Sequence, residues 1–169
     1  MQNDKKLFLD LGCGSRKKSG CVGVDRCCLS GVDVVTDTDK GLPFKDNSLD
    51  GIYSNYFMEH TSDLIRMFQE MYRVCKAGAV VTMTVPYYTS INAFKDPTHK
   101  QFFTEETFKY FSKDKWYGSD YKINTDFKVM DIQYHDSGIV RIMPFFKKYI
   151  RRFVINAVGA ITVKLKVVK

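Results

Sequence analysis

Three aspartates follow short apolar runs of the sequence, and their carboxylates could bind parts of a nucleoside ligand. Asp10 stands in LDLGCG, where Gly12 and Gly14 allow the backbone to approach a ligand closely. Asp25 ends CVGVD, and a carboxylate there can accept both hydroxyls of a ribose. Asp37 follows VDVVT, where it could accept from an adenine amino group. Each aspartate alone could be an ordinary turn residue, but the set of three favours a nucleoside site.

Three histidines are the candidates for acid–base chemistry. His99 lies in the loop KDPTHK and is the candidate base or substrate ligand, because imidazole can exchange a proton near neutral pH. A histidine that only braces the loop is the alternative. His60, in MEH, is expected to order its own loop, and His135 is expected to be structural.

The cysteines predict neither a metal centre nor a disulfide framework. The chain has five, an odd number, and no pair has CxxC spacing. We therefore expect free thiols and no metal site.

Apolar periodicity predicts the elements that must position these residues. Strands are expected at 7–11, 21–25, 32–36, 49–54, 79–85, 127–135 and 161–168, and helices at 62–76, 104–112 and 144–158. Buried strands that alternate with turns and a long helix favour a mostly parallel sheet, which binds ligands at the carboxyl ends of its strands. The final ITVKLKVVK alternates apolar and basic residues, as in an antiparallel strand with one wet face.

Four runs of the sequence together resemble the class I S-adenosylmethionine-dependent methyltransferases. They are LDLGCG, GVDR, VVTDTDKGLPFKDNSLDGIYSNYFMEH and YRVCKAGAVVTMTVPY, within about residues 7–113. A fifth, DPTHKQFFTEETF, resembles a block of a compact subgroup of these enzymes. The resemblance implies an α/β, Rossmann-like, mostly parallel sheet of seven strands in the order 3-2-1-4-5-7-6. It also implies S-adenosylmethionine as the cofactor.

The resemblance carries cofactor-binding roles over to residues after each of the first four strands. These are Asp10, Gly12, Cys13 and Gly14 after the first, Asp25 and Arg26 after the second, Asp37 and Thr38 after the third, and Asn55 and Tyr56 after the fourth. They correspond to the methionine side, the ribose, the adenine side and the surroundings of the sulfonium, in that order.

The first two crossovers are too short for the helices of the family. Nine residues separate the first two expected strands and six separate the next two, whereas a helical crossover needs about a dozen. The third glycine of the usual motif is also replaced, because Gly14 is followed by Ser15-Arg16-Lys17. We expect these helices to be shortened or missing, and Arg16, Lys17 or Lys18 to contact the methionine carboxylate unless all three are simply solvated.

The expected function is methyl transfer to an acceptor, with a sugar or lipid-linked glycan favoured by the subgroup resemblance and a basic tail. The loop 87–103 is expected to form a substrate lid with His99 facing the methyl group. One alternative is a catalytically silent, methyltransferase-like binding module. Another is a nicotinamide-dependent enzyme, which the absence of a full GxGxxG and the length of the chain disfavour.

The positive charge lies in the tail. Net charge is +7, yet residues 139–169 hold eight basic residues and no acidic one, so we expect a local anionic partner and no specific nucleic acid. The helix 144–158 is amphipathic, and its apolar face is expected to pack on the core, with a membrane surface as the alternative. That apolar face comprises Phe146, Tyr149, Ile150, Phe153 and Ala157. A second subunit could cover the face that the missing helices leave bare, giving a homodimer.

We expect one domain over residues 1–169. Residues 1–113 would form the cofactor-binding core and substrate loop, and residues 114–169 the C-terminal strands and the basic amphipathic helix. The absence of a signal-peptide pattern and of an 18-residue apolar run favours a cytoplasmic protein, which the tail could bring to a membrane.

Overall fold

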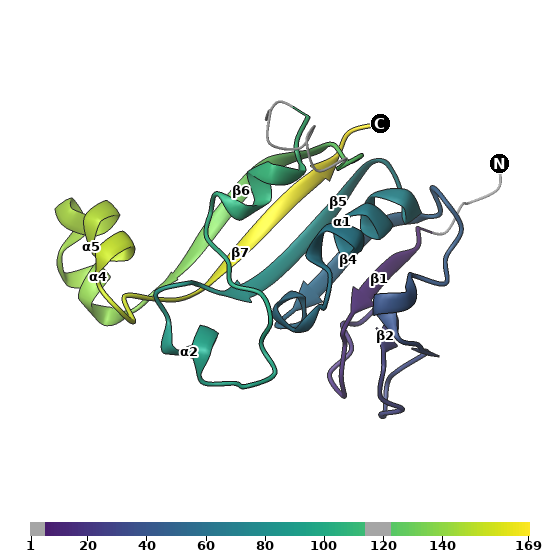
Figure 1. Ribbon diagram of the computed structural model, residues 1–169, viewed down its shortest axis with the longest axis horizontal. Coiled ribbons are helices and arrows are strands. Elements are labelled where there is room, and N and C mark those ends of the chain that lie inside the picture. The colour runs from purple at the N-terminus through teal and green to yellow at the C-terminus, as the bar shows by residue number, and fades with distance from the viewer. Residues whose placement is uncertain (1–5, 114–122) are drawn as a thin grey trace.

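The computed structural model describes residues 6–113 and 123–169, which contain a seven-stranded sheet (Figure 1). The strand order is β3-β2-β1-β4-β5-β7-β6, as the family resemblance implies. Strand β7 is antiparallel to β5 and β6, and the other pairs are parallel. The strands are β1 (Phe8–Leu11), β2 (Val22–Asp25), β3 (Val34–Val35), β4 (Leu49–Asn55), β5 (Cys75–Pro86), β6 (Phe127–Asp136) and β7 (Val158–Val167).

One face of the sheet forms the core. Leu9 pairs with Ile52, Ile52 with Val81 and Val81 with Leu165, so the four side chains make a row across β1, β4, β5 and β7. All four are fully buried. Helix α1 (Leu64–Val74) covers this face and buries Phe68, as the 3.6-residue periodicity predicts (Figure 1).

The opposite face of the sheet is polar. Tyr53 pairs with Thr82, Thr82 with Lys164 and Lys164 with Asp131, which makes a second row of side chains across β4, β5, β7 and β6. His135 lies on this face, with its Nε2 2.8 Å from Thr162 Oγ1, consistent with the structural role expected for it. The wet face predicted for the last strand is confirmed. The strands do not present a bare apolar face that a second subunit would have to cover, and the homodimer stays a prediction.

The loop between β1 and β2 replaces the first crossover helix. Residues 12–21 contain no helix, as expected from their number. Lys17 Nζ bonds Asp33 Oδ2 at 2.8 Å, and its side chain covers Gly23. Lys18 Nζ lies 4.6 Å from the centre of the Tyr53 ring, a cation–π contact. Both lysines therefore brace the loop against the sheet, and a contact of Arg16, Lys17 or Lys18 with a methionine carboxylate stays a prediction.

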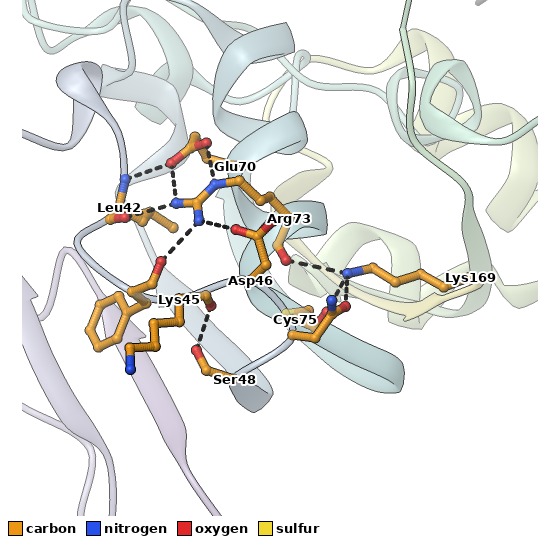
Figure 2. Close-up of polar contacts among 10 residues, drawn as sticks. Leu42, Lys45, Asp46, Ser48, Glu70, Arg73, Cys75 and Lys169 are labelled. Atoms are coloured by element: carbon orange, nitrogen blue, oxygen red, sulfur yellow. Dashed lines mark hydrogen bonds and ion pairs between the residues drawn. The ribbon is translucent and has the colours of Figure 1, made fainter.

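Arg73, in the last turn of α1, fixes the loop that precedes β4 (Figure 2). Its guanidinium bonds Glu70 at 2.8 Å, Asp46 at 2.6 Å and the carbonyls of Leu42 and Phe44 at 2.9 Å. The fork of five N–H donors is well suited to join a carboxylate and several carbonyls. The start of β4 is thereby tied to the end of α1.

Two short helical elements differ from the sequence-based expectation. The segment expected to be helical at 104–112 forms a 3-10 helix, η3 (Thr107–Phe111), whose Phe111 stacks on Phe68 at 3.6 Å between ring centres. The loop 87–103 contains a further short helix, α2 (Ile91–Phe94), and its ends are joined where Tyr87 bridges Phe103.

The expected tail helix is broken and does not pack on the core. It is preceded by α4 (Gly138–Ile142) and consists of η4 (Pro144–Phe146) and α5 (Lys147–Phe153), which stand beyond the ends of β6 and β7 (Figure 1). Of the expected apolar face only Ile150 and Ala157 are buried, in a small cluster with Val140. Phe146, Tyr149 and Phe153 are 57%, 65% and 73% exposed. We call residues 138–157 the tail lobe.

No helix in the described part of the chain has the length and apolar character needed to span a membrane.

Candidate functional site

The carboxyl ends of β1, β2, β3 and β4 meet at a pocket of about 240 Å³. Its wall brings together six residues predicted from the sequence, which are Gly12, Asp25, Arg26, Asp37, Thr38 and Tyr56. It also includes Asp39, Phe57, His60, Thr61 and Thr98. This is the edge of a parallel sheet at which α/β proteins bind ligands.

Gly12 is required by the geometry of the pocket wall. Its φ is +71°, and an added Cβ would lie 2.2 Å from the Phe57 ring. Its N–H donates to the Val24 carbonyl at 2.8 Å, which holds the glycine turn against β2. The ring of Phe57 can therefore lie directly on the backbone, as the glycine motif predicts.

Two backbone hydrogen bonds hold the Asp25 carboxylate in place, and its oxygens can still accept hydrogen bonds from a ligand. Its Oδ2 accepts from Gly14 N–H and its Oδ1 from Cys27 N–H, both at 2.9 Å. Each carboxylate oxygen keeps a further lone-pair site. The two backbone bonds fix the side chain at the pocket, where it can accept two hydroxyls of a ligand.

Asp37 and Thr38 begin the short 3-10 helix η1 (Thr38–Lys40). Asp37 Oδ1 caps this turn by accepting from Asp39 N–H at 3.3 Å, and Thr38 is buried beneath it. Asp39 accepts from Ser62 N–H at 3.2 Å, and hydrogen bonds from Ser62 lower the pKa of Asp39. Asp39 was not among the residues predicted from the sequence, although the repeated acid in TDTD was a signal for it.

The other predicted cofactor residues do not line the pocket. Asp10 is 6% exposed and accepts from Lys18 N–H at 2.7 Å, so it orders the glycine loop. Cys13 is buried, and this burial raises the pKa of its thiol. Gly14 acts through its bond to Asp25, and Asn55 is exposed at the end of β4.

Comparisons with known proteins agree with this arrangement. Residues 16–83 match the family model described as a methyltransferase domain. A structure of an S-adenosylmethionine-dependent methyltransferase from Archaeoglobus fulgidus is 21% identical, with a TM-score of 0.68 over 96% of this chain and 86% of that one. The chain has the fold of the class I methyltransferases, and residues 16–83 are similar to their methyltransferase domain.

Two further solved structures share the fold of this chain. The YcgJ protein from Bacillus subtilis is 16% identical, with a TM-score of 0.63 over 98% of this chain and 93% of that one. A Haloferax volcanii protein described as a methyltransferase, in complex with the activator Trm112, is 13% identical, with a TM-score of 0.61 over 98% and 84%. A search of curated proteins found no match to the sequence.

Tyr56 turns the chain away from the end of β4. Its φ is +52°, a left-handed conformation that is uncommon for a bulky residue. Its N–H donates to the Thr84 carbonyl at 2.9 Å, and the side chain is 47% exposed at the pocket. Strain of this kind is frequent at binding sites, where the surrounding structure maintains it.

His99 lies behind the pocket wall and contacts it through His60. The two imidazole rings meet edge to face, 4.8 Å apart between centres, and only His60 lines the pocket. The His99 side chain is 8% exposed. The expected direct contact of His99 with a bound methyl group is therefore not formed by the pocket as it stands.

Glu59 is a buried acid that sequence reasoning missed. It is 1% exposed, and neither carboxylate oxygen has a hydrogen-bond partner in the described structure. Burial raises the pKa of Glu59 to about 7, with His99 acting in the opposite direction. The acid within the apolar run YFMEH was its signal, but only the fold shows that it is buried.

A larger pocket, of about 420 Å³, lies between the ends of β5 and β6 and the tail lobe. Tyr87, Glu105 and Tyr134 form one side of it, and α5 contributes four cations, Lys147, Lys148, Arg151 and Arg152. Arg151 and Lys147 pair with Asp136 at 2.6 Å and 3.3 Å. Within the described residues no ion pair is formed by Lys148 or Arg152, so both can meet an anion.

Proposed function

We propose that this domain binds S-adenosylmethionine in the pocket at β1–β4 and transfers its methyl group to an acceptor. The observation that carries the proposal is the meeting of Gly12, Asp25 and Asp37, which come from three different strand ends, at one pocket. Each suits a part of a nucleoside cofactor. Gly12 lets the backbone approach the ligand closely, Asp25 can accept hydrogen bonds from ribose hydroxyls, and Asp37 can accept one from the adenine amino group.

The chain mainly supplies alignment in this proposal. The cofactor, when bound, provides an activated methyl group on a sulfonium. Asp25 fixes the ribose position, η1 with Asp37 borders the adenine side, and Asp10 holds the glycine loop in place. Tyr56 and Phe57 line the same pocket and would exclude water from the reacting region.

If the acceptor atom is a hydroxyl oxygen, the reaction also needs a general base that removes the hydroxyl proton. We assign His99 to the acceptor rather than to the cofactor, because it contacts the pocket-lining His60 and does not itself line the pocket that contains Asp25. Among the described histidines, His135 is bonded to Thr162 on the polar face and has no contact with the pocket.

We favour a lipid-linked glycan or another anionic sugar derivative as the acceptor. The tail lobe supports this choice, because Lys148 and Arg152 line its pocket and can bind a phosphate. Phe145 and Ile142 are 95% and 80% exposed beside these cations. A basic surface with exposed apolar side chains is suited to an anionic membrane, where such acceptors reside.

The test is methyl transfer from labelled S-adenosylmethionine to separated lipid-linked glycans, free sugars and proteins. We expect label in the lipid-linked glycan fraction and a loss of label with Lys148→Glu/Arg152→Glu. Label in proteins alone would overturn the acceptor assignment. Cofactor binding without transfer to any fraction would instead favour a catalytically silent binding module.

A further inference from the structure

Glu59, His60 and His99 form a cluster of metal-ligand side chains beside the pocket. Glu59 and His60 belong to the 3-10 helix η2 (Met58–His60), and His99 follows α2. One carboxylate oxygen and one ring nitrogen from each histidine all lie within 4.8 Å of one another. Two imidazoles and a carboxylate are a common ligand set for divalent transition metals.

The buried carboxylate of Glu59 lacks a partner, and a bound cation would supply one. The carboxylate is 1% exposed, and both of its oxygens lack a hydrogen-bond partner in the described structure. A buried carboxylate without a partner is costly, and proteins compensate for it by pairing, metal coordination or protonation.

Both histidines form their hydrogen bonds through Nδ1, so Nε2 is the nitrogen left to bind a metal; His99 Nε2 also lies 3.9 Å from Asp96 Oδ2. His99 Nδ1 lies 2.9 Å from the Ala93 carbonyl, which can only accept, so Nδ1 carries the proton. The Thr98 hydroxyl donates to Asp96 Oδ1 at 2.7 Å, so at 3.0 Å from His60 Nδ1 it must accept. Each neutral ring therefore keeps an unprotonated Nε2. Such outer bonds orient histidines that bind metals.

The backbone fixes the two halves of the cluster together. The N–H groups of Lys100 and Gln101 both donate to the Glu59 carbonyl, at 2.7 Å and 3.0 Å. The Gln101 side chain donates to the Thr61 carbonyl at 3.0 Å. The loop that carries His99 is therefore docked on the turn that carries the other two side chains.

We propose that Glu59, His60 and His99 bind a divalent first-row metal ion such as Zn²⁺ or Mn²⁺. Ligand bonds of about 2.1 Å place tetrahedral ligand atoms about 3.4 Å apart. The three ligand atoms, now within 4.8 Å of one another, would therefore have to approach each other by about an ångström when the ion binds. Three protein ligands leave a coordination position open. Because His60 lines the pocket, an acceptor oxygen can complete the site, and this last step alone rests on the proposed function.

This site was not foreseen from the sequence, which predicted no metal because the cysteines lack a ligand pattern. Glu59 and His60 are adjacent, but His99 is separated from them by the whole of α1 and β5. Only the fold brings the three together.

Calorimetric titration of the chelator-treated protein with Zn²⁺ or Mn²⁺ alone tests the proposal. We expect one ion per chain, with affinity at least tenfold weaker in Glu59→Gln and in His99→Ala. His135→Ala removes an imidazole from the polar face and serves as the matched control, with unchanged affinity. Circular dichroism verifies that each variant is folded.

Cobalt absorption gives a second readout that does not depend on activity. Co²⁺ bound to this site shows d–d bands without the charge-transfer band that thiolate ligands produce, and Cys27→Ser/Cys28→Ser leaves the spectrum unchanged. Absence of saturable binding, or binding that survives both Glu59→Gln and His99→Ala, overturns the proposal. Neither outcome bears on whether the chain binds S-adenosylmethionine.

Discussion

The aspartates of the candidate site mainly accept hydrogen bonds from backbone N–H groups and so fix the loops that carry them. Asp25 accepts from two N–H groups, Asp10 from one, and Asp37 caps a turn. The sequence could identify these acids because each follows an apolar run. It could not identify Glu59, because its importance depends on burial, nor the position of His99 behind His60, because that depends on how the loop 87–103 docks.

Replacement of His99 by alanine should reduce methyl transfer at least tenfold while leaving cofactor affinity within about twofold of wild type. The reason is that His99 contacts His60 and not the wall formed by Asp25 and Asp37. Turnover and S-adenosylhomocysteine binding measured on the same preparation check this. Full turnover in the variant would reduce His99 to a brace for its loop.

The Glu70–Arg73 pair should make folding stability depend on pH in the acid range. Hydrogen bonds from Arg73 lower the pKa of Glu70, so the folded state holds the ionised form more strongly than the unfolded state. This stability is complete above the unfolded pKa of about 4.3 and is lost as the pH falls through the lower folded pKa.

We therefore expect Glu70→Gln to reduce the free energy of unfolding at pH 7 by about 1–3 kcal/mol and to flatten its fall in acid. Urea unfolding from pH 7 to pH 3 measures both effects. Glu106→Gln, in an exposed pair with Lys109, is the matched control and should change stability by less than about 1 kcal/mol. Equal effects of the two substitutions would contradict the role given to the Arg73 network.

At the scale of elements, periodicity predicted the strands and α1 well, and chain length between strands correctly excluded the first crossover helices. The loop that replaces these helices could not be predicted, because Lys17 contacts Asp33 and Lys18 contacts Tyr53 only when the sheet has folded. The tail was misplaced for a similar reason. An amphipathic pattern gives the apolar face of a helix but not what that face meets.

The tail lobe should bind anionic membranes. Flotation with liposomes containing anionic lipid is expected for the wild type at low salt, since exposed Phe145 and Phe153 lie beside Lys148 and Arg152. Lys148→Glu/Arg152→Glu should abolish it. Lys128→Glu/Lys166→Glu changes the net charge equally on the polar face of the sheet and should still float. Equal loss in both variants would indicate only a general charge effect.

For the whole molecule, the sheet order places two functional regions along one edge. The pocket at β1–β4 and the larger pocket at β5 and β6 both lie at the carboxyl ends of parallel strands, because β7 is antiparallel to both β5 and β6. The polar second face explains how the sheet dispenses with the first crossover helices. The family resemblance predicted this topology, whereas the polar face emerges only from the strand register.

The central claim is that the pocket at β1–β4 binds S-adenosylmethionine, and calorimetric titration with S-adenosylhomocysteine tests it most directly. We predict one saturable site per chain, with affinity about ten- to a hundredfold weaker in Asp25→Asn, the effect of losing a charged hydrogen bond. Asp131→Asn, on the polar face, should bind as the wild type does. No saturable binding by the folded wild-type protein, or equal binding by Asp25→Asn, would contradict the claim.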